Sequence, residues 1–105
     1  MCGLALNYVR RNLFDRSAGR KKVLIVMTDG ISQDEVSTPA GLLKRMGVNI
    51  FALGIGRQYS MRQLQQIASS SRFVFTSGFR AMGSVVGTIQ RKACVAAGTH
   101  CYPLY

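Results

Sequence analysis

The alternation of short apolar runs with segments of helical periodicity most constrains the fold of this chain. The runs expected to form strands are residues 22–28, 48–54 and 72–76. The segments with helical spacing of apolar residues are 3–14, 37–46, 60–68 and 79–89. Strands that alternate with helices through short connections predict a parallel sheet with helices on both faces. We therefore expect an open α/β fold with about three strands and four helices.

The first strand shows no alternation of polar and apolar side chains. Residues 22–28 read KVLIVMT, which predicts that both faces of this strand are buried, as they are in central parallel strands. A sheet of only three such strands would have two apolar edges, and unpaired edges tend to pair with other chains. We therefore interpret the α/β unit as incomplete, and expect the isolated 105-residue chain to be unstable, to aggregate or to pair edge to edge.

Several residues predict where the helices begin and end. Ser37 or Thr38 is expected to cap the second helix, which stops at Gly47. Ser60 and Gln63 have the spacing of a capping box for the third helix. The helix residues expected to face the core are Leu6, Val9, Leu13, Met61, Leu64, Ile67, Ala68, Phe79, Met82, Val85, Val86 and Ile89.

The length of 105 residues corresponds to one domain or part of one. We assign residues 1–94 to this domain and residues 95–105, which lack periodicity, to an irregular tail. The longest apolar run is Val23–Met27, far shorter than a membrane span. The N-terminal residues do not follow the pattern of a signal peptide, because the basic residues come after the apolar stretch.

Charge and cysteine content leave several interpretations open. The chain has 14 basic and 4 acidic residues and a net charge of +10, which serves solubility or favours an anionic partner such as a sulfated polysaccharide. Basic and aromatic residues do not interleave, so nucleic acid is disfavoured. Cys2, Cys94 and Cys101 lack metal-site spacing. They are either buried or free thiols, or one of them bonds another chain.

Asp29 is the strongest candidate for a functional residue. It follows the strand 22–28, and Gly30 allows a sharp turn after it. Ligands of open parallel sheets gather at the carboxyl ends of the strands, where a carboxylate suits a hard cation such as Mg²⁺. The alternative is that Asp29 only forms a turn. Asp34 and Glu35 follow in the next loop, where they either add negative potential for a cation or form a solvated helix start.

Enzymatic alternatives find little support in the sequence. A phosphatase with a strand-end aspartate needs a second acid two residues later, and that position is Ile31. Gly54-Ile-Gly56 begins like a dinucleotide-binding motif, but Tyr59 occupies the position of its third glycine, and no P-loop occurs. The single His100 lies in the irregular tail, so no nucleophile–histidine pair is expected. We therefore expect a protein that is not an enzyme.

Several segments together resemble a known family. The strand and turn VLIVMTDG, the helix TPAGLLKRMG, the strand VNIFALGIG, the segment RFVFTSGF and the preceding GLALNYVRRNLF are similar to the C-terminal part of a von Willebrand factor type A domain. The resemblance covers residues 3–93 in order. It is closest to the matrix members of the family, of the collagen and matrilin type.

The resemblance implies an extracellular, non-enzymatic module that binds a matrix or cell-surface protein through a divalent cation. The cation site takes a DxSxS motif, a threonine and the aspartate of TDG, and only the last matches here, as Asp29. Asp15-Arg-Ser17 has Gly19 at the fifth position and follows a helix, so we read it as coincidence. With one ligand, these 105 residues are expected to hold Mg²⁺ or another divalent cation weakly or not at all.

Overall fold

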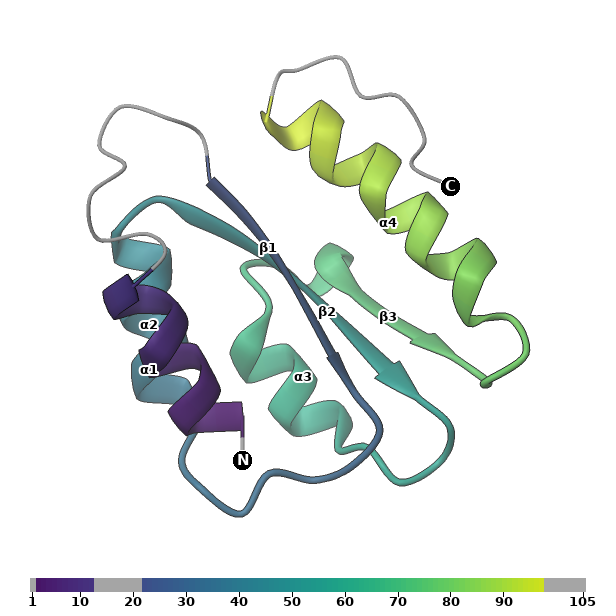
Figure 1. The fold of residues 1–105 in the computed structure, drawn as a ribbon, viewed down its shortest axis with the longest axis horizontal. Coiled ribbons are helices and arrows are strands. Elements are labelled where there is room, and N and C mark those ends of the chain that lie inside the picture. The colour runs from purple at the N-terminus through teal and green to yellow at the C-terminus, as the bar shows by residue number, and fades with distance from the viewer. Residues whose placement is uncertain (1, 13–21, 98–105) are drawn as a thin grey trace.

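A computed structural model describes residues 2–12 and 22–97, and it shows an α/β fold (Figure 1). The three strands are parallel and lie in the order β1-β2-β3. The prediction of three strands and four helices in an open parallel sheet is confirmed. The elements are α1 (Cys2–Asn12), β1 (Lys22–Thr28), α2 (Ser37–Arg45), β2 (Val48–Ile55), α3 (Met61–Ile67), a 3₁₀ turn (Ser71–Phe73), β3 (Val74–Ser77) and α4 (Met82–Ala97).

The strand register brings three loops to one edge of the sheet. Thr28, the last residue of β1, lies opposite Gly54 of β2. In turn, Gly54 lies opposite Thr76 of β3, and Ile55 opposite Ser77. The loops that follow the three strands therefore leave the sheet side by side, at the end where parallel sheets carry their ligands.

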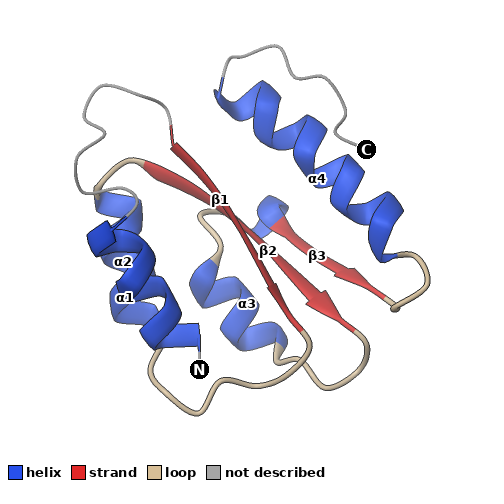
Figure 2. Ribbon diagram, in the orientation of Figure 1, coloured by secondary structure: helices blue, strands red, loops and turns tan. Residues whose placement is uncertain are grey.

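Helices cover both faces of the sheet (Figure 2). α2 and α3 pack on one face, with α1 lying against α2, and α4 covers the other face. Alternate residues of β2 supply the two cores. Ile50 and Ala52 face α2 and α3, whereas Phe51 and Leu53 face α4. All four are fully buried. Burying a side chain of the size of Ile50, Phe51 or Leu53 contributes about 1.5–3 kcal/mol relative to leaving it exposed.

The prediction that both faces of β1 are buried is wrong. All its residues are partly exposed, and 53% of the Met27 side chain is accessible. The reason is its place in the sheet: β1 pairs with β2 alone, so its second edge has no strand beside it among the described residues. β2, between two strands, is the strand that behaves as a central one.

Two side chains predicted to face the core are exposed instead. Phe79 is 66% exposed, because it lies in the loop before α4, which begins at Met82. Met61 is 43% exposed at the first position of α3. Leu6, Leu64, Ile67, Ala68 and Ile89 are buried as predicted. The side chains of Val9 and Leu13 lie outside what the structure describes.

The last helix is longer than the periodicity indicated. α4 continues to Ala97, three residues into the segment that we assigned to the irregular tail. Residues 98–105 lie outside the described part of the chain, as does Cys101, and the side chains of Cys2 and Cys94 are also not described. No described helix has the length and apolar character needed to cross a membrane.

The helix caps are partly as predicted. Ser60 caps α3 by accepting a hydrogen bond from the Gln63 backbone N–H at 3.3 Å. The prediction of the reciprocal bond, from the Gln63 side chain back to Ser60, is wrong. The Gln63 side chain forms hydrogen bonds with the backbone of Ser32 instead. The stop after α2 is confirmed, since Gly47 has a φ of +86°, which favours glycine. Ser37 and Thr38 do not cap α2; they lie inside its first turn, after Val36.

Candidate functional site

Asp29 lies at the carboxyl end of β1, as predicted. The turn that carries it is fixed by its neighbours, because the Thr28 hydroxyl accepts from the Gly30 N–H and donates to the Gly30 carbonyl, both at 3.2 Å. The Asp29 side chain is exposed. Among the described residues no side chain or backbone group forms a hydrogen bond with its carboxylate. Its two oxygens are therefore available to a ligand.

The described residues do not form a complete cation site around Asp29. No group of three or more Asp, Glu, His or Cys residues that could hold a metal occurs within residues 2–12 and 22–97. Mg²⁺ gives up its waters reluctantly, and one carboxylate leaves most of the octahedron to solvent. The donor set present is thus one carboxylate, which does not fit a tightly bound metal.

Asp34 is committed to the N-terminus of α1. Its Oδ1 accepts from the Gly3 N–H at 3.1 Å and its Oδ2 from the Leu4 N–H at 2.8 Å. The Ser32 hydroxyl also donates to Oδ1. These bonds, chiefly the one from Ser32, lower the pKa of Asp34 to about 2. Asp34 therefore acts as a long-range helix cap, a role that neither sequence interpretation included.

The approach of this loop to α1 requires a glycine. A Cβ atom built on Gly3 would lie 2.2 Å from the Glu35 carbonyl oxygen and 2.8 Å from Asp34 Oδ2. Real Cβ atoms do not come this close to backbone oxygen, so any side chain here would push the loop away. No local sequence pattern indicates this contact, because the two segments are about thirty residues apart.

Glu35 caps α2 in place of the residues predicted to do so. Its Oε1 accepts from the Thr38 N–H at 2.8 Å and from the Ser37 hydroxyl. The pKa of Glu35 is lowered, first by the bond from Ser37 and then by the bond from Thr38. A carboxylate at a helix N-terminus satisfies otherwise unpaired N–H groups and complements the helix dipole. This agrees with the interpretation of Glu35 as part of a helix start.

The loop after Asp29 is also fastened to α3. The Ser32 backbone N–H donates to Gln63 Oε1, and the Ser32 carbonyl accepts from Gln63 Nε2, both at 2.8 Å. A side-chain amide that pairs with both backbone groups of one residue fixes the position of that residue closely. The loop thus has hydrogen bonds to both α1 and α3, and it holds Asp29 on an anchored segment.

The loops after β2 and β3 meet beside the first. The Gly56 N–H donates to the Ser77 carbonyl at 2.8 Å, and Gly56 has a φ of +79°. A Cβ on Gly56 would lie 2.9 Å from Cε2 of Phe79, so the ring packs directly on this glycine. Gly54 makes a similar contact with the Tyr59 ring, at 2.6 Å from its built Cβ. These glycines allow close packing of aromatic rings, the use expected of a glycine-rich strand exit.

Comparisons with known proteins agree with this geometry. The family description of the von Willebrand factor type A domain matches residues 1–88. Human matrilin-1 is 35% identical over 102 residues, which cover 90% of this chain and 20% of matrilin-1. The human collagen alpha-1(XX) chain is 36% identical over 99 residues, which cover 88% of this chain and 8% of the collagen. The chain therefore spans a fifth or less of the length of these relatives.

Solved structures show the same similarity. Proximal thread matrix protein 1 from the mussel byssus superimposes with a TM-score of 0.79 at 31% identity, over 89% of this chain and 24% of that protein. A second structure of the mussel protein, with zinc in its metal-ion-dependent adhesion site (MIDAS), gives a TM-score of 0.80 at 31% identity and the same coverage.

Proposed function

The chain belongs to the von Willebrand factor type A domain family, and from this membership we propose that it is a non-enzymatic module that binds a protein ligand in the extracellular matrix. Its relatives include matrilin and collagen chains, which are matrix proteins. The longer proteins to which such modules belong supply further segments, so the identity of the ligand is not carried by these 105 residues.

The observation that carries the proposal is the state of Asp29. Its carboxylate is exposed, free of hydrogen bonds to the described residues, and held on an anchored loop at the carboxyl end of the sheet. Asp34 and Glu35, in contrast, are occupied by helix N-termini. Among the described acids, Asp29 is thus the one that remains available for binding, and by resemblance it corresponds to the family's TDG aspartate.

We assign to Asp29 the role of one ligand of a divalent cation, whose other protein ligands would come from the family's DxSxS and threonine positions. The mussel relative holds zinc at this type of site. The 105 residues contribute a single ligand, so we expect them to bind Mg²⁺ or Zn²⁺ only weakly, with a Kd of about 10⁻³ M or weaker, the weak end of protein cation sites.

Calorimetric titration of the chain with MgCl₂ or ZnCl₂ tests this assignment. We expect Asp29→Asn to abolish the weak binding, because among the described acids it removes the carboxylate that forms no hydrogen bond. Asp15→Asn is the matched control, since Asp15 belongs to the Asp-x-Ser sequence that we read as coincidence, and it should leave the affinity within about twofold of the wild type. Loss of binding in Asp15→Asn with retention in Asp29→Asn would refute the role of Asp29.

A phosphatase-like activity remains the less favoured alternative. Ile31 lies where a second acid would be needed, and its side chain is 62% exposed. The two other acids of the described loop, Asp34 and Glu35, accept hydrogen bonds at the N-termini of α1 and α2. General acid–base chemistry on a phosphate ester would therefore lack its proton donor at this site.

A further inference from the structure

The charges of this chain are separated along the sequence. Residues 36–105 contain no acidic residue, although they carry Lys44, Arg45, Arg57, Arg62, Arg72, Arg80, Arg91 and Lys92. The two acids nearest to them, Asp34 and Glu35, are bound to helix N-termini. No ion pair of Arg57, Arg62 or Arg80 with another described residue is present. From β2 onward, the described surface is therefore cationic, and no acid in this part of the sequence offsets its charge.

Exposed apolar side chains gather at one end of the sheet. Of the six large apolar residues that are exposed in the described part of the chain, Leu4 and Tyr8 belong to α1. The other four lie at the carboxyl ends of the strands or in the loops and helix start that follow them; they are Met27, Ile31, Met61 and Phe79. Apolar side chains concentrated on one part of a surface indicate an interaction site.

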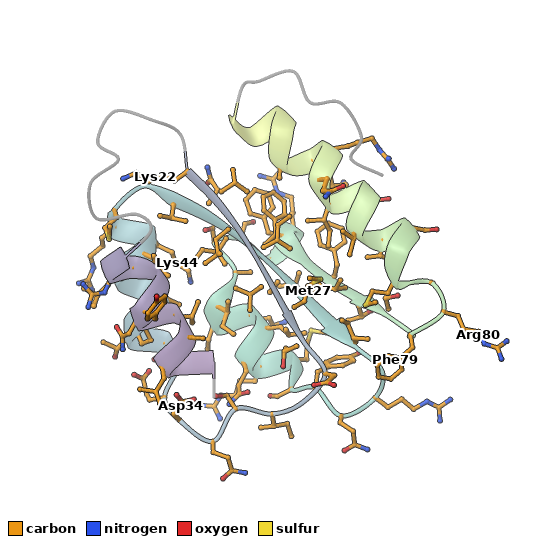
Figure 3. The ribbon with its side chains drawn as sticks, viewed as in Figure 1. Lys22, Met27, Asp34, Lys44, Phe79 and Arg80 are labelled. Carbon is orange, nitrogen blue, oxygen red and sulfur yellow. The ribbon has the colours of Figure 1, made fainter. Side chains whose placement is uncertain are left out.

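Phe79 and two arginines form one surface at this end, which we call the carboxyl-end patch (Arg57, Phe79 and Arg80). The Phe79 ring packs on Gly56, and the arginines directly follow these two contacting residues in sequence. Consecutive Cα atoms are about 3.8 Å apart, so both arginines originate next to the ring. Figure 3 shows Phe79 at the sheet end and Arg80 extending outward from the loop beside it. All three residues are exposed.

We propose that the carboxyl-end patch binds a protein segment that carries a carboxylate next to an apolar side chain, and that it does so without a metal ion. A guanidinium group can bond both oxygens of a carboxylate at once. Phe79 is 66% exposed, so its ring offers an apolar surface next to residues that carry these cations. This inference rests on the proposed function, because it identifies the class of protein ligand that the same end of the sheet would accept.

The apolar component favours a protein ligand over a sulfated polysaccharide. A polysaccharide needs only cations, and the chain offers these elsewhere too, for example Arg45 and Arg72 at the amino ends of β2 and β3. At the carboxyl end, in contrast, the arginines lie near exposed apolar residues, namely Phe79, Met61 and Met27. Arginine and aromatic residues are also the types enriched at the centres of protein interfaces.

The test is a fluorescence anisotropy titration of the chain with a labelled peptide of alternating Glu and Phe residues. We expect Arg57→Gln/Arg80→Gln to raise the Kd for the peptide more than about tenfold. Each lost charge-assisted hydrogen bond corresponds to a change in affinity of about tenfold or more. The control Arg45→Gln/Arg72→Gln removes the same charge from the opposite end and should change affinity less than about threefold. EDTA should have no effect.

Two further variants separate recognition from a loss of folding. Phe79→Ser should weaken binding of the Glu–Phe peptide but not of a peptide in which Ser replaces Phe. The charge reversal Arg57→Glu/Arg80→Glu should bind a Lys–Phe peptide instead, a gain that an unfolded protein would not show. Circular dichroism spectra that match the wild type establish folding of each variant.

Three results would overturn the inference. If Arg57→Gln/Arg80→Gln and Arg45→Gln/Arg72→Gln weaken peptide binding equally, the peptide is held by general charge attraction and not by the patch. Loss of binding in EDTA together with loss in Asp29→Asn would support the cation-dependent function and refute the metal-free patch. Competition by a heparin oligosaccharide, combined with no effect of Phe79→Ser on the peptide, would identify the surface as a polyanion site.

Discussion

At the scale of single residues, the acids after β1 have separate tasks. Asp29 is exposed and forms no hydrogen bond with the part of the chain that the structure describes, whereas Asp34 binds the first turn of α1 and Glu35 the first turn of α2. Helix N-termini carry partial positive charge and unpaired N–H groups. Three acids in seven residues thus serve two helix starts and one available ligand position, within a chain that is otherwise strongly basic.

The Asp34 contact predicts a pH dependence of stability. Its pKa falls from 3.8 to about 2 on folding, so its contribution is complete above the unfolded value and is lost as the pH falls through the folded one. We expect Asp34→Asn to lower the urea midpoint at pH 7. The difference in urea midpoint between this variant and the wild type should disappear between pH 4 and pH 2. Urea unfolding followed by circular dichroism at several pH values measures this difference.

Glu35→Gln provides the comparison for Asp34→Asn. It neutralises an acid in the same loop, but its contacts are local to α2, so it leaves the long-range link to α1 intact. If the urea midpoint of Asp34→Asn differs from that of the wild type by the same amount from pH 7 to pH 2, the carboxylate charge does not stabilise the contact with Gly3 and Leu4.

At the scale of elements, β1 is the exceptional strand. Its sequence is that of a central strand, but it pairs on one side only, and its residues are partly exposed. An apolar strand with a free edge presents unpaired N–H and C=O groups to other chains. α4 contacts β1, but within residues 2–12 and 22–97 no strand pairs with the second edge of β1.

We therefore expect the isolated 105-residue chain to associate through β1. Its apparent mass by analytical ultracentrifugation should rise with concentration, and Met27→Lys should reduce this association because a charge on an edge strand opposes pairing. Met61→Lys is the matched control: Met61 has a comparable exposure, 43% against 53% for Met27, but lies on α3. A monomer with a sharp, concentration-independent thermal transition would contradict this expectation.

At the scale of the whole molecule, the net charge of +10 opposes compactness. Like charges repel through solvent over about 10 Å at 0.1 M salt and over about 3 Å at 1 M salt. Because the residues from 36 onward carry no acids, little of this repulsion is offset within that part of the chain. Self-repulsion of this kind destabilises the folded state more than the expanded unfolded chain.

Stability should therefore rise with salt. We expect the Tm to increase by a few degrees between about 0.01 M and 0.5 M NaCl, since screening a repulsion of about 1 kcal/mol shifts the Tm of a domain of this size by about 4–8 °C. Differential scanning calorimetry measures the change. A Tm that falls with NaCl would show that attractive ion pairs, and not repulsion, dominate the electrostatics of the fold.

The sequence by itself determined the elements, their order and the type of sheet. The periodicity of residues such as Leu64, Ile67 and Ile89 reports local geometry, and a buried strand such as 48–54 is apolar wherever it lies. The TDG turn likewise placed Asp29 at the carboxyl end of a strand, because that placement follows from chain order alone. These features depend on neighbours that are close in sequence.

Only the tertiary structure decided what depends on distant neighbours. It assigned Asp34 to α1 and the Gln63 side chain to Ser32, contacts that span about thirty residues. It left β1 at an edge, although its sequence resembles that of a central strand, and it exposed Phe79 beside two arginines. Hydrogen-bond partners and exposure are properties of the packed arrangement, so no local pattern encodes them. The residues of the carboxyl-end patch come together because β2 and β3 lie side by side and end in matching register.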